Sequence, residues 1–540
     1  PKPQTPNPKP QTPNSPLEPT KRECKKSCVM IINMEEKTQM EIDKHFEELK
    51  STFRSNRTRS LAYRLEQLQI LKETLASKRQ ELYKALYEDL NMSEHAVELS
   101  FYLAATDEVN CAISNLTSWA KPVKCETPLS LFPSAVSEQY EPLGTCLIIG
   151  SWNYPLTTVV LPLVSAIAAG NVAVVKPSES AVACSALMRS IVESLDQASY
   201  RCLEGGPETA KMLNKKPFDA IVFTGGTEIG KYVALDSARN LSKLVLELGG
   251  KNPVIVDLSC NLPLTIQRLV NGKFFNSGQT CVTADYIFVH KSISEIFIKD
   301  FIAATKELWG VDARENKSYG RIINQRHAER VLSYLEGEEK NIIFQAGTPD
   351  AKARFVPPTI VLNPSPSSRL HSNEIFGPIV YIMEFNEPNQ VIDYILARDK
   401  PLQINYFGDP TNNLYKMIRD NTSSGGILVN DLLINYLCYS SGFGGVGMSG
   451  QGKIRGFPGF KELSNSKSII ERSRSGFMDI PMRYLPETPA KVRQMALISK
   501  LLGGKTFEPF CKKAAVAFLL IGVWLFLSWL IKKKILVINL

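Results

Sequence analysis

The stretch TCLIIGSWNYP, residues 145–155, is a short apolar run of strand-favouring residues that ends in a polar turn. NVAVVKPSES, residues 171–180, has the same form, and residues 156–169 between the two runs have a helical pattern. A strand, a helix and a second strand in this order form a βαβ unit, in which the two strands are parallel. DAIVFTGGTEIGK, residues 219–231, adds a strand, a glycine turn and a helix start. The sequence therefore predicts an α/β fold with a largely parallel sheet.

The alternation of strands and helices extends in both directions from this region. KLVLELGGKNPVIV, residues 243–256, holds two further strand-like runs, and the alternation resumes after residue 281. From Asp43 to about Leu90, leucines recur every three or four residues with charges between them, which indicates amphipathic helix. A chain of 540 residues is long enough for two or three domains. We therefore expect a second α/β domain after the first.

The charge of the chain is concentrated at its two ends. The formal net charge is +9, of which residues 1–28 carry +4 and residues 505–540 carry +5. Residues 29–504 are therefore neutral overall. Because a surface that follows a nucleic-acid backbone needs many clustered cations, this distribution argues against a nucleic-acid partner.

The N-terminal segment is rich in proline. Its first fourteen residues, PKPQTPNPKPQTPN, are one heptapeptide written twice, and such segments favour extended, unpacked chain. We therefore expect residues 1–42 to form a disordered tail. No apolar signal region precedes the body, which argues against secretion.

The C-terminal segment contains the longest apolar run. Ala514–Ile531 is 18 residues without a charge, with lysines on both sides. At about 1.5 Å per residue it spans roughly 27 Å, close to the thickness of a hydrocarbon core. A buried core helix is the alternative, but flanking lysines at the chain terminus disfavour it. The sequence predicts a single-pass tail anchor at 514–531 with the body in the cytosol. Residues 475–513 form a linker whose segment 490–505 is amphipathic.

Cysteine and histidine usage indicates free thiols and no metal site. The eleven cysteines follow no repeating spacing, which is typical of a reducing compartment rather than a disulfide framework. The five histidines do not fall at the spacing of helical metal ligands.

Cys281 and Asn153 are candidates for covalent chemistry. Cys281 ends the stretch NSGQTC, whose polar residues surround it with dipoles that favour a reactive thiolate. Asn153 follows a strand and offers a neutral amide donor for a developing oxyanion. The alternatives are an ordinary loop cysteine and an ordinary turn asparagine.

Two further groups of residues have the chemistry of a nucleotide site. Lys176 and Glu179 follow a strand and suit ribose hydroxyls, although a solvated turn has the same pattern. Gly225, Gly226 and Gly230 lie at a strand-to-helix turn that suits a pyrophosphate, although the turn lacks the G-x-G-x-x-G fingerprint.

Two more motifs each contain a glutamate. Glu247 in LELGGK precedes two glycines and could activate water as a base, with a surface glutamate as the alternative. Glu374 and Phe376 in NEIFGP place a carboxylate and an aromatic ring two residues apart.

Together these motifs resemble one family. EPLGTCLIIGSWNYPL, VVKPSE, LELGGK, NSGQTC, EIFGPI and FGGVGMSG occur in this order, and the chain is identified as similar to the aldehyde dehydrogenases from about Asp43 to Arg474. Within that family it most resembles the class 3 branch and its membrane-anchored fatty aldehyde dehydrogenases.

The resemblance implies a role for each candidate residue. Cys281 would be the nucleophile, Asn153 would stabilise the oxyanion and Glu247 would activate the hydrolytic water. The cofactor would be NAD, with NADP as an alternative. Lys176 and Glu179 would bind the adenine ribose, Gly225, Gly226 and Gly230 the pyrophosphate, and Glu374 with Phe376 the nicotinamide ribose.

The resemblance also implies an architecture, a substrate class and a location. The expected domains are a Rossmann-like NAD-binding domain (43–120 and 145–246), a catalytic domain (247–430) and a small β oligomerisation arm (121–144 and 431–474). A homodimer, a fatty aldehyde substrate and an anchor in the membrane of the endoplasmic reticulum follow. The mitochondrial outer membrane and peroxisomes are alternative locations.

Two other functions stay open at this point. One is a cofactor-binding membrane scaffold without activity, which the presence of Cys281, Asn153 and Glu247 disfavours. The other is a relative that transfers its thioester to coenzyme A, which Glu247 disfavours because a base is needed for hydrolysis.

Overall fold

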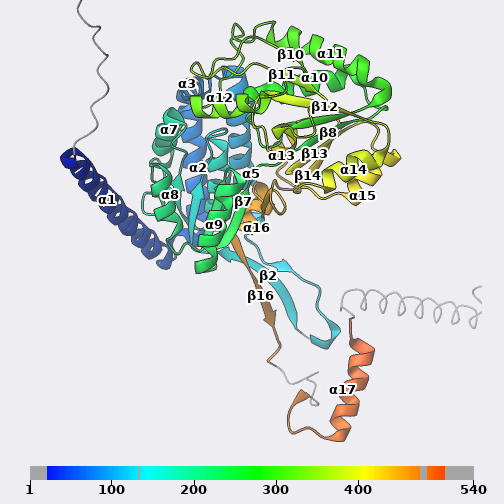
Figure 1. The fold of residues 1–540 in the computed structure, drawn as a ribbon. Coiled ribbons are helices and arrows are strands. Elements are labelled where there is room, and N and C mark those ends of the chain that lie inside the picture. The colour runs from blue at the N-terminus through cyan, green and yellow to red at the C-terminus, as the bar shows by residue number, and fades with distance from the viewer. Residues whose placement is uncertain (1–20, 132–133, 475–482, 505–540) are drawn as a thin grey trace, which may run out of the picture.

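The computed structural model describes residues 21–131, 134–474 and 483–504. These residues form two large sheets covered by helices and a third, small sheet that projects from the body (Figure 1). The expected α/β fold is therefore confirmed.

The first large sheet has the order β15-β7-β6-β3-β4-β5, and all neighbours are parallel except β15 and β7. Its strands are β3 (Thr145–Ile149), β4 (Val172–Lys176), β5 (Tyr200–Cys202), β6 (Ala220–Thr224), β7 (Lys243–Glu247) and β15 (Gly450–Gln451). One face packs on α2 (Leu61–Ser77), α3 (Arg79–Leu90), α5 (Leu103–Trp119), α6 (Thr157–Ala169) and α7 (Val182–Val192), with the short α4 (Glu94–Val97) nearby. The other face packs on α1 (Lys21–Arg54), α8 (Pro207–Asn214) and α9 (Thr227–Asn240).

The second large sheet has the order β10-β11-β12-β9-β8-β13-β14, and all neighbours are parallel except β10 and β11. Its strands are β8 (Pro253–Val256), β9 (Tyr286–His290), β10 (Ile342–Gln345), β11 (Thr359–Leu362), β12 (Ile379–Phe385), β13 (Gln403–Phe407) and β14 (Gly426–Val429). Helices α10 (Leu262–Phe274) and α11 (Lys291–Trp309) cover one face. Helices α12 (Gln325–Leu332), α14 (Pro388–Leu396) and α15 (Asn413–Asn421) cover the other, and α13 (Arg369–Ser372) precedes β12.

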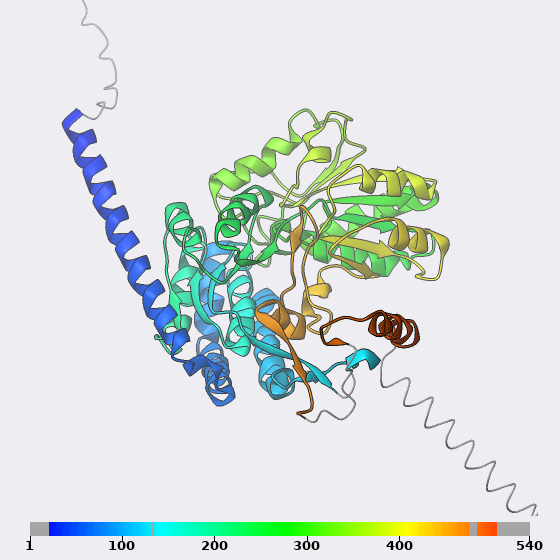
Figure 2. The same ribbon diagram turned by 90° about the horizontal axis from the view of Figure 1, so that it is seen from below.

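The third sheet lies outside the two cores. It has the order β1-β2-β16, with β1 (Val123–Lys124), β2 (Ala135–Pro142) and β16 (Ser464–Glu471) all antiparallel. Figures 1 and 2 show this ribbon reaching away from the body towards α17 (Pro489–Leu502), while α16 (Gly456–Glu462) packs against α5 and α6. The remaining short helices are η1 (Arg57–Arg59), η2 (Glu98–Tyr102), η3 (Leu129–Leu131), η4 (Phe275–Gly278), η5 (Ser333–Leu335) and η6 (Ile434–Leu437).

The expected disordered tail was wrong for residues 21–42, which belong to α1. The proline-rich composition ends at Pro19, and Lys21–Arg54 contains neither proline nor glycine, so nothing interrupts a helix there. The C-terminal part of α1 is anchored by Ile42, Phe46 and Leu49, which are buried against the first sheet. Residues 1–20 lie outside the described residues.

The predicted membrane anchor at 514–531 lies outside the described residues. Within residues 21–131, 134–474 and 483–504, no helix combines the length and apolar character needed to cross a bilayer.

Candidate active site

A cavity of about 290 Å³ lies where segments from both large sheets meet. From the first sheet it is lined by residues that follow β3, β6 and β7. From the second it is lined by residues 280–282 before β9 and by residues before β12. Ligands of parallel α/β sheets bind outside the carboxyl ends of strands, which is where the first-sheet segments lie; the second-sheet segments lie at the amino ends of β9 and β12. Of the predicted site residues, the cavity is lined by Asn153, Gly225, Gly226, Glu247, Cys281, Glu374 and Phe376.

The cavity brings together segments that are distant in the chain, but it does not include every candidate. Lys176, Glu179 and Gly230 do not line it. Lys176 ends β4, is 2% exposed, and donates hydrogen bonds to Glu179 Oε2 (2.8 Å) and to the Pro177 carbonyl (3.1 Å). Gly230 lies within α9, where a Cβ would be 2.6 Å from the Leu248 side chain. Gly230 therefore allows close packing of α9 on the loop after β7.

The loop before Cys281 depends on an unusual backbone. Asn276, Ser277 and Gly278 have φ values of 49°, 50° and 70°, which lie in the left-handed region. At Gly278 a Cβ would lie 2.2 Å from the Gly377 carbonyl oxygen, so no side chain fits. With this backbone, the loop before Cys281 lies directly against Gly377, in the loop that carries Phe376.

Gln279, one of the polar residues of NSGQTC, holds the backbone of the loop before Cys281. Gln279 is fully buried, and its Nε2 donates to the carbonyls of Asn276 (3.0 Å) and Arg321 (3.1 Å). Its Oε1 accepts a hydrogen bond from Ile323 N (3.0 Å). These contacts pair the Gln279 side chain with backbone groups of two neighbouring loops.

The thiol of Cys281 is protonated in this environment. Its pKa is raised to about 12, mainly by burial and in addition by the carboxylates of Glu374 and Glu247, which repel a thiolate. The backbone N–H groups of Cys281 and Val282 oppose this effect weakly. Ionisation of Cys281 therefore needs a base or a change of the local charge.

Asn153 is held in one orientation beside the Cys281 loop. Its Oδ1 accepts a hydrogen bond from Ser151 Oγ (2.6 Å), which leaves the amide nitrogen directed to the other side. Nδ2 donates one proton to the Gln279 carbonyl (2.9 Å), and its second proton is available for a ligand. In return, Asn276 Nδ2 donates to the Asn153 carbonyl (3.0 Å).

Glu247 ends β7 and is 4% exposed, and neither carboxylate oxygen has a hydrogen-bond partner among the described residues. Burial raises its pKa well above the usual range, and the nearby Lys453 ammonium opposes that rise. Lys453 Nζ donates to the Gly444 carbonyl (2.9 Å), and a Cβ on Gly444 would lie 2.9 Å from Glu247 Oε1. Gly444 thus separates the carboxylate from the ammonium.

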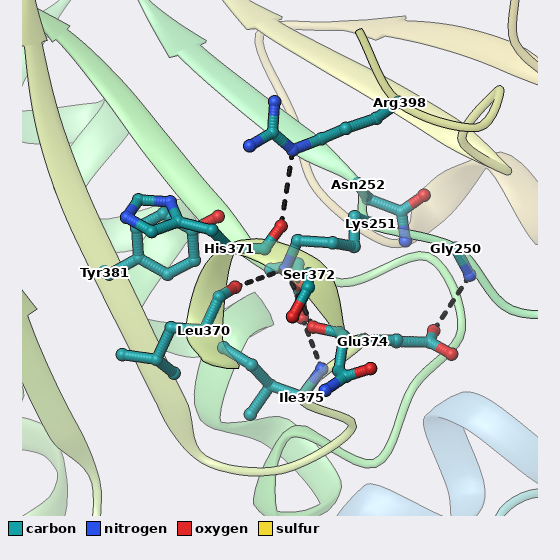
Figure 3. A network of polar contacts seen from close by, with 12 residues as sticks. Gly250, Lys251, Asn252, Leu370, His371, Ser372, Glu374, Ile375, Tyr381 and Arg398 are labelled. Carbon is teal, nitrogen blue, oxygen red and sulfur yellow. Dashed lines mark hydrogen bonds and ion pairs between the residues drawn. The ribbon is translucent and has the colours of Figure 1, made fainter. Parts of the chain in front are cut away.

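Glu374 lies against the glycines that follow Glu247. Its Oε1 accepts a hydrogen bond from Gly250 N (3.0 Å), as Figure 3 shows, and a Cβ on Gly249 would lie 2.1 Å from its Oε2. Burial raises the pKa of Glu374 to about 7. Phe376 has φ of 47° and packs edge-to-face on Trp152, with 5.4 Å between ring centroids.

The turn between β6 and α9 exposes backbone atoms to the cavity. Gly225 N donates to the Glu247 carbonyl (3.0 Å), and Gly226 precedes the first turn of α9, where N–H groups lack helical acceptors. A Cβ on Gly225 would lie 2.6 Å from the Phe223 ring. This turn has the donors and the access that a phosphate group requires.

Sequence reasoning missed Asn252 and Lys453. Asn252 Nδ2 donates to the Cys281 carbonyl (2.6 Å), and its Oδ1 accepts from Gln403 N (2.8 Å). Asn252 therefore connects the loop that contains Cys281 to β13. Asn252 directly follows the LELGGK motif, which was a usable signal. No local pattern marks Lys453, because its relation to Glu247 arises only from the pairing of β15 with β7.

Metal ligands are not grouped in the described parts of the chain. Across residues 21–131, 134–474 and 483–504, no three His, Cys, Asp or Glu side chains are arranged to hold an ion.

Comparison with known proteins gives a consistent result. The chain matches the Aldehyde dehydrogenase family over residues 18–469. It is 37% identical to the dimeric NADP-preferring aldehyde dehydrogenase of Canis lupus familiaris over 82% of this chain and 97% of that protein. It is 35% identical to aldehyde dehydrogenase family 3 member A2 of Rattus norvegicus over 84% of this chain and 93% of that protein. A solved structure, the substrate-bound state of Staphylococcus aureus AldH, superposes with a TM-score of 0.81 at 33% identity, covering 85% and 99% of the two chains.

Proposed function

Because the chain belongs to the aldehyde dehydrogenase family, we propose that it oxidises long-chain fatty aldehydes to fatty acids, with Cys281 as the covalent nucleophile. The expected resemblance to the class 3 branch is confirmed by the matches to family 3 relatives, and the cofactor is NAD or NADP. The observation that carries the proposed roles is the single cavity shared by Cys281, Asn153 and Glu247.

The residues on the cavity fit a dinucleotide. The first turn of α9, which begins after Gly226, offers backbone N–H donors that suit a pyrophosphate, and Gly225 and Gly226 place no side chain in front of them. Glu374 offers a buried carboxylate for ribose hydroxyls, and Phe376 offers an aromatic edge. Lys176 and Glu179 would hold the adenine ribose outside the cavity, at the end of β4. When bound, NAD or NADP supplies the acceptor for the two electrons that leave the aldehyde carbon.

The first half of the reaction is nucleophilic attack. Glu247, a strong base when ionised because its pKa is raised, takes the Cys281 thiol proton. The Cys281 sulfur then bonds to the aldehyde carbon, and the carbonyl electrons move to the oxygen. The second N–H of Asn153 Nδ2 and the Cys281 backbone N–H donate hydrogen bonds to that oxyanion.

The oxyanion adduct becomes a thioester when its C–H hydrogen leaves with the bonding electrons as hydride, for which bound NAD or NADP would be the acceptor, and Glu247 releases the thiol proton to solvent. The second half is hydrolysis of this thioester. Glu247 removes a proton from water, the resulting hydroxide attacks the acyl carbon, and the Cys281 sulfur leaves and takes that proton back from Glu247. Asn153 stabilises this second oxyanion with the same N–H groups.

The walls of the cavity support an apolar substrate. Leu161, Phe443 and Ile454 line it, together with the aromatic rings of Tyr154 and Tyr436. An alkyl chain gains about 0.8 kcal/mol per methylene moved from water into such a site. A membrane anchor at 514–531 would place the enzyme where long-chain aldehydes partition, and we propose the endoplasmic reticulum as its location.

We also propose that two copies pair through the arm. β2 and β16 form an extended antiparallel ribbon outside both cores, and among the described residues β1 and β16 are the two edge strands of this sheet. Exposed edges of this kind favour pairing with another chain. The Canis relative is named as dimeric.

The test is a chain-length series. Purified full-length protein is given aldehydes of increasing length with NAD or NADP, and cofactor reduction is followed by absorbance. We expect kcat/KM to rise with chain length up to about a dozen carbons or more, in line with the gain per methylene. Cys281→Ser should lower the rate by about a thousandfold or more for every aldehyde. A clear preference for short aldehydes would refute the fatty substrate, and an active Cys281→Ser protein would refute the nucleophile.

A further inference from the structure

Lys251 lies at the centre of a closed network of polar contacts beside the cavity (Figure 3). Its ammonium group donates to the carbonyls of Leu370 (2.7 Å) and Asn373 (2.9 Å) and forms an ion pair with Asp285. An ammonium has three donors, so all of them are used. None of these partners lines the cavity.

Asp285 completes the network from the other side. Its Oδ2 pairs with Lys251, while its Oδ1 accepts a hydrogen bond from Ile375 N (2.9 Å). The carbonyl of Asn373 and the N–H of Ile375, which flank Glu374 in the chain, are therefore both held by this ion pair. The Glu374 carboxylate accepts a hydrogen bond from the backbone N–H of Gly250 (3.0 Å), the residue before Lys251.

The pair is also connected to the loop that contains Cys281. Asn252, the residue after Lys251, accepts a backbone hydrogen bond from Asp285 N (3.0 Å) and donates from Nδ2 to the Cys281 carbonyl (2.6 Å). The Lys251–Asp285 pair thus connects the segments that carry Glu247, Cys281 and Glu374.

The pair is buried and geometrically fixed. The side chains of Lys251 and Asp285 are 9% and 5% exposed, and the ammonium lies 5.7 Å and 5.3 Å from the ring centroids of Tyr286 and Tyr381. Buried ion pairs add little net stability compared with apolar side chains, but they impose a defined geometry when every donor is satisfied. A surface salt bridge would not fix a loop in this way.

We propose that the Lys251–Asp285 ion pair is a positioning element that fixes the Glu374 carboxylate for the ribose of the bound cofactor. This inference depends on the proposed role of Glu374 in cofactor binding. Lys251 and Asp285 do not touch cofactor or substrate; they act through the backbone on either side of Glu374.

The choice of variants follows from the charges near Asp285. Lys273 is fully buried nearby and donates to the Ala284 carbonyl (2.7 Å), so Asp285→Asn leaves two ammonium groups with Glu374 as the nearby carboxylate. The double variant Lys251→Met/Asp285→Asn removes one of them and keeps the volume filled. Asp257→Asn is the matched control, because Asp257 is a similarly buried carboxylate in the same sheet that binds Ser259 and Asn412 and does not line the cavity.

The experiment measures the dissociation constants of NAD and NADP for the full chain by quenching of tryptophan fluorescence, for which Trp152 lines the cavity. Loss of a charge-assisted contact predicts about tenfold weaker binding in Asp285→Asn and in the double variant. The KM for aldehyde should stay within about twofold, as should all constants of Asp257→Asn.

A double-mutant cycle with Glu374→Ala separates positioning from general destabilisation. If the pair acts through Glu374, adding Asp285→Asn to Glu374→Ala changes cofactor affinity no further. Additive losses would overturn the proposal, as would unchanged affinity in both pair variants. If Glu374→Ala alone leaves affinity unchanged, the role of Glu374 in the proposed function is wrong instead.

Discussion

Burial raises the pKa of three acidic side chains on the cavity. The pKa of Cys281 is raised to about 12, that of Glu374 to about 7, and that of Glu247 well above its usual range. The common cause is the loss of water around groups that are charged when ionised. Perturbed groups that converge on one cavity are typical of active sites. The pKa of the Cys281 thiol also depends on Glu247, because an ionised carboxylate there raises it.

Lys453 is the residue whose charge affects the pKa of Glu247. Its ammonium lowers the pKa of Glu247, so replacement by methionine should raise that pKa. Since only the ionised carboxylate acts as a base, the rising limb of kcat against pH should move to higher pH in Lys453→Met. The measurement is a pH–rate profile under saturating aldehyde and cofactor. Lys453→Arg keeps the positive charge and should keep the profile; a limb that does not move in Lys453→Met would show that another group limits the rate.

At the scale of elements, the loop between α10 and β9 carries the strain of the site. Gly278 has a left-handed φ of 70° and a backbone carbonyl where a Cβ would be. Left-handed backbone costs a residue with a side chain about 1–2 kcal/mol even without a clash. This loop therefore tolerates only glycine at residue 278.

Gly278→Ala should move the Cys281 loop away from Gly377 and lower both the melting temperature and kcat. Gly206→Ala is the control, because Gly206 has φ of −79° and no atom within 4 Å of an added Cβ. Thermal unfolding and steady-state rates of both variants provide the check. Equal stability and activity in the two proteins would contradict the strained-loop account.

Sequence patterns identified the elements better than the contacts between them. The strands at 145–155, 171–180 and 219–231 and their intervening helix occur as expected, because local apolar runs and turn residues specify them. The candidates Asn153, Glu247 and Cys281 meet because each stands at the end of a strand or in a loop of a parallel α/β unit. The roles of Gln279 and the pair Lys251–Asp285 depend on contacts between segments far apart in sequence, which no local pattern contains.

For the whole molecule, the net positive charge lies in the sequence at the two ends, residues 1–28 and 505–540, and the residues between them are neutral overall. We predict that a protein ending at residue 504 keeps its kcat/KM for short, water-soluble aldehydes, because the cavity is built from residues 151–455. With long-chain aldehydes presented in lipid vesicles, its rate should fall relative to the full chain. Vesicle flotation and rates measured together check this prediction. Equal rates on vesicles would contradict a role of residues 505–540 in delivering substrate.

The most direct test of the central claim is mass spectrometry of enzyme quenched during turnover with a long-chain aldehyde and NAD or NADP. Glu247→Gln protein should form the acyl group more slowly, because the thiol loses its base, but should then retain it, because hydrolysis of the thioester also needs the base. The account predicts one added acyl mass on the peptide that contains Cys281. An acyl adduct on another residue, or none in either protein, would contradict it.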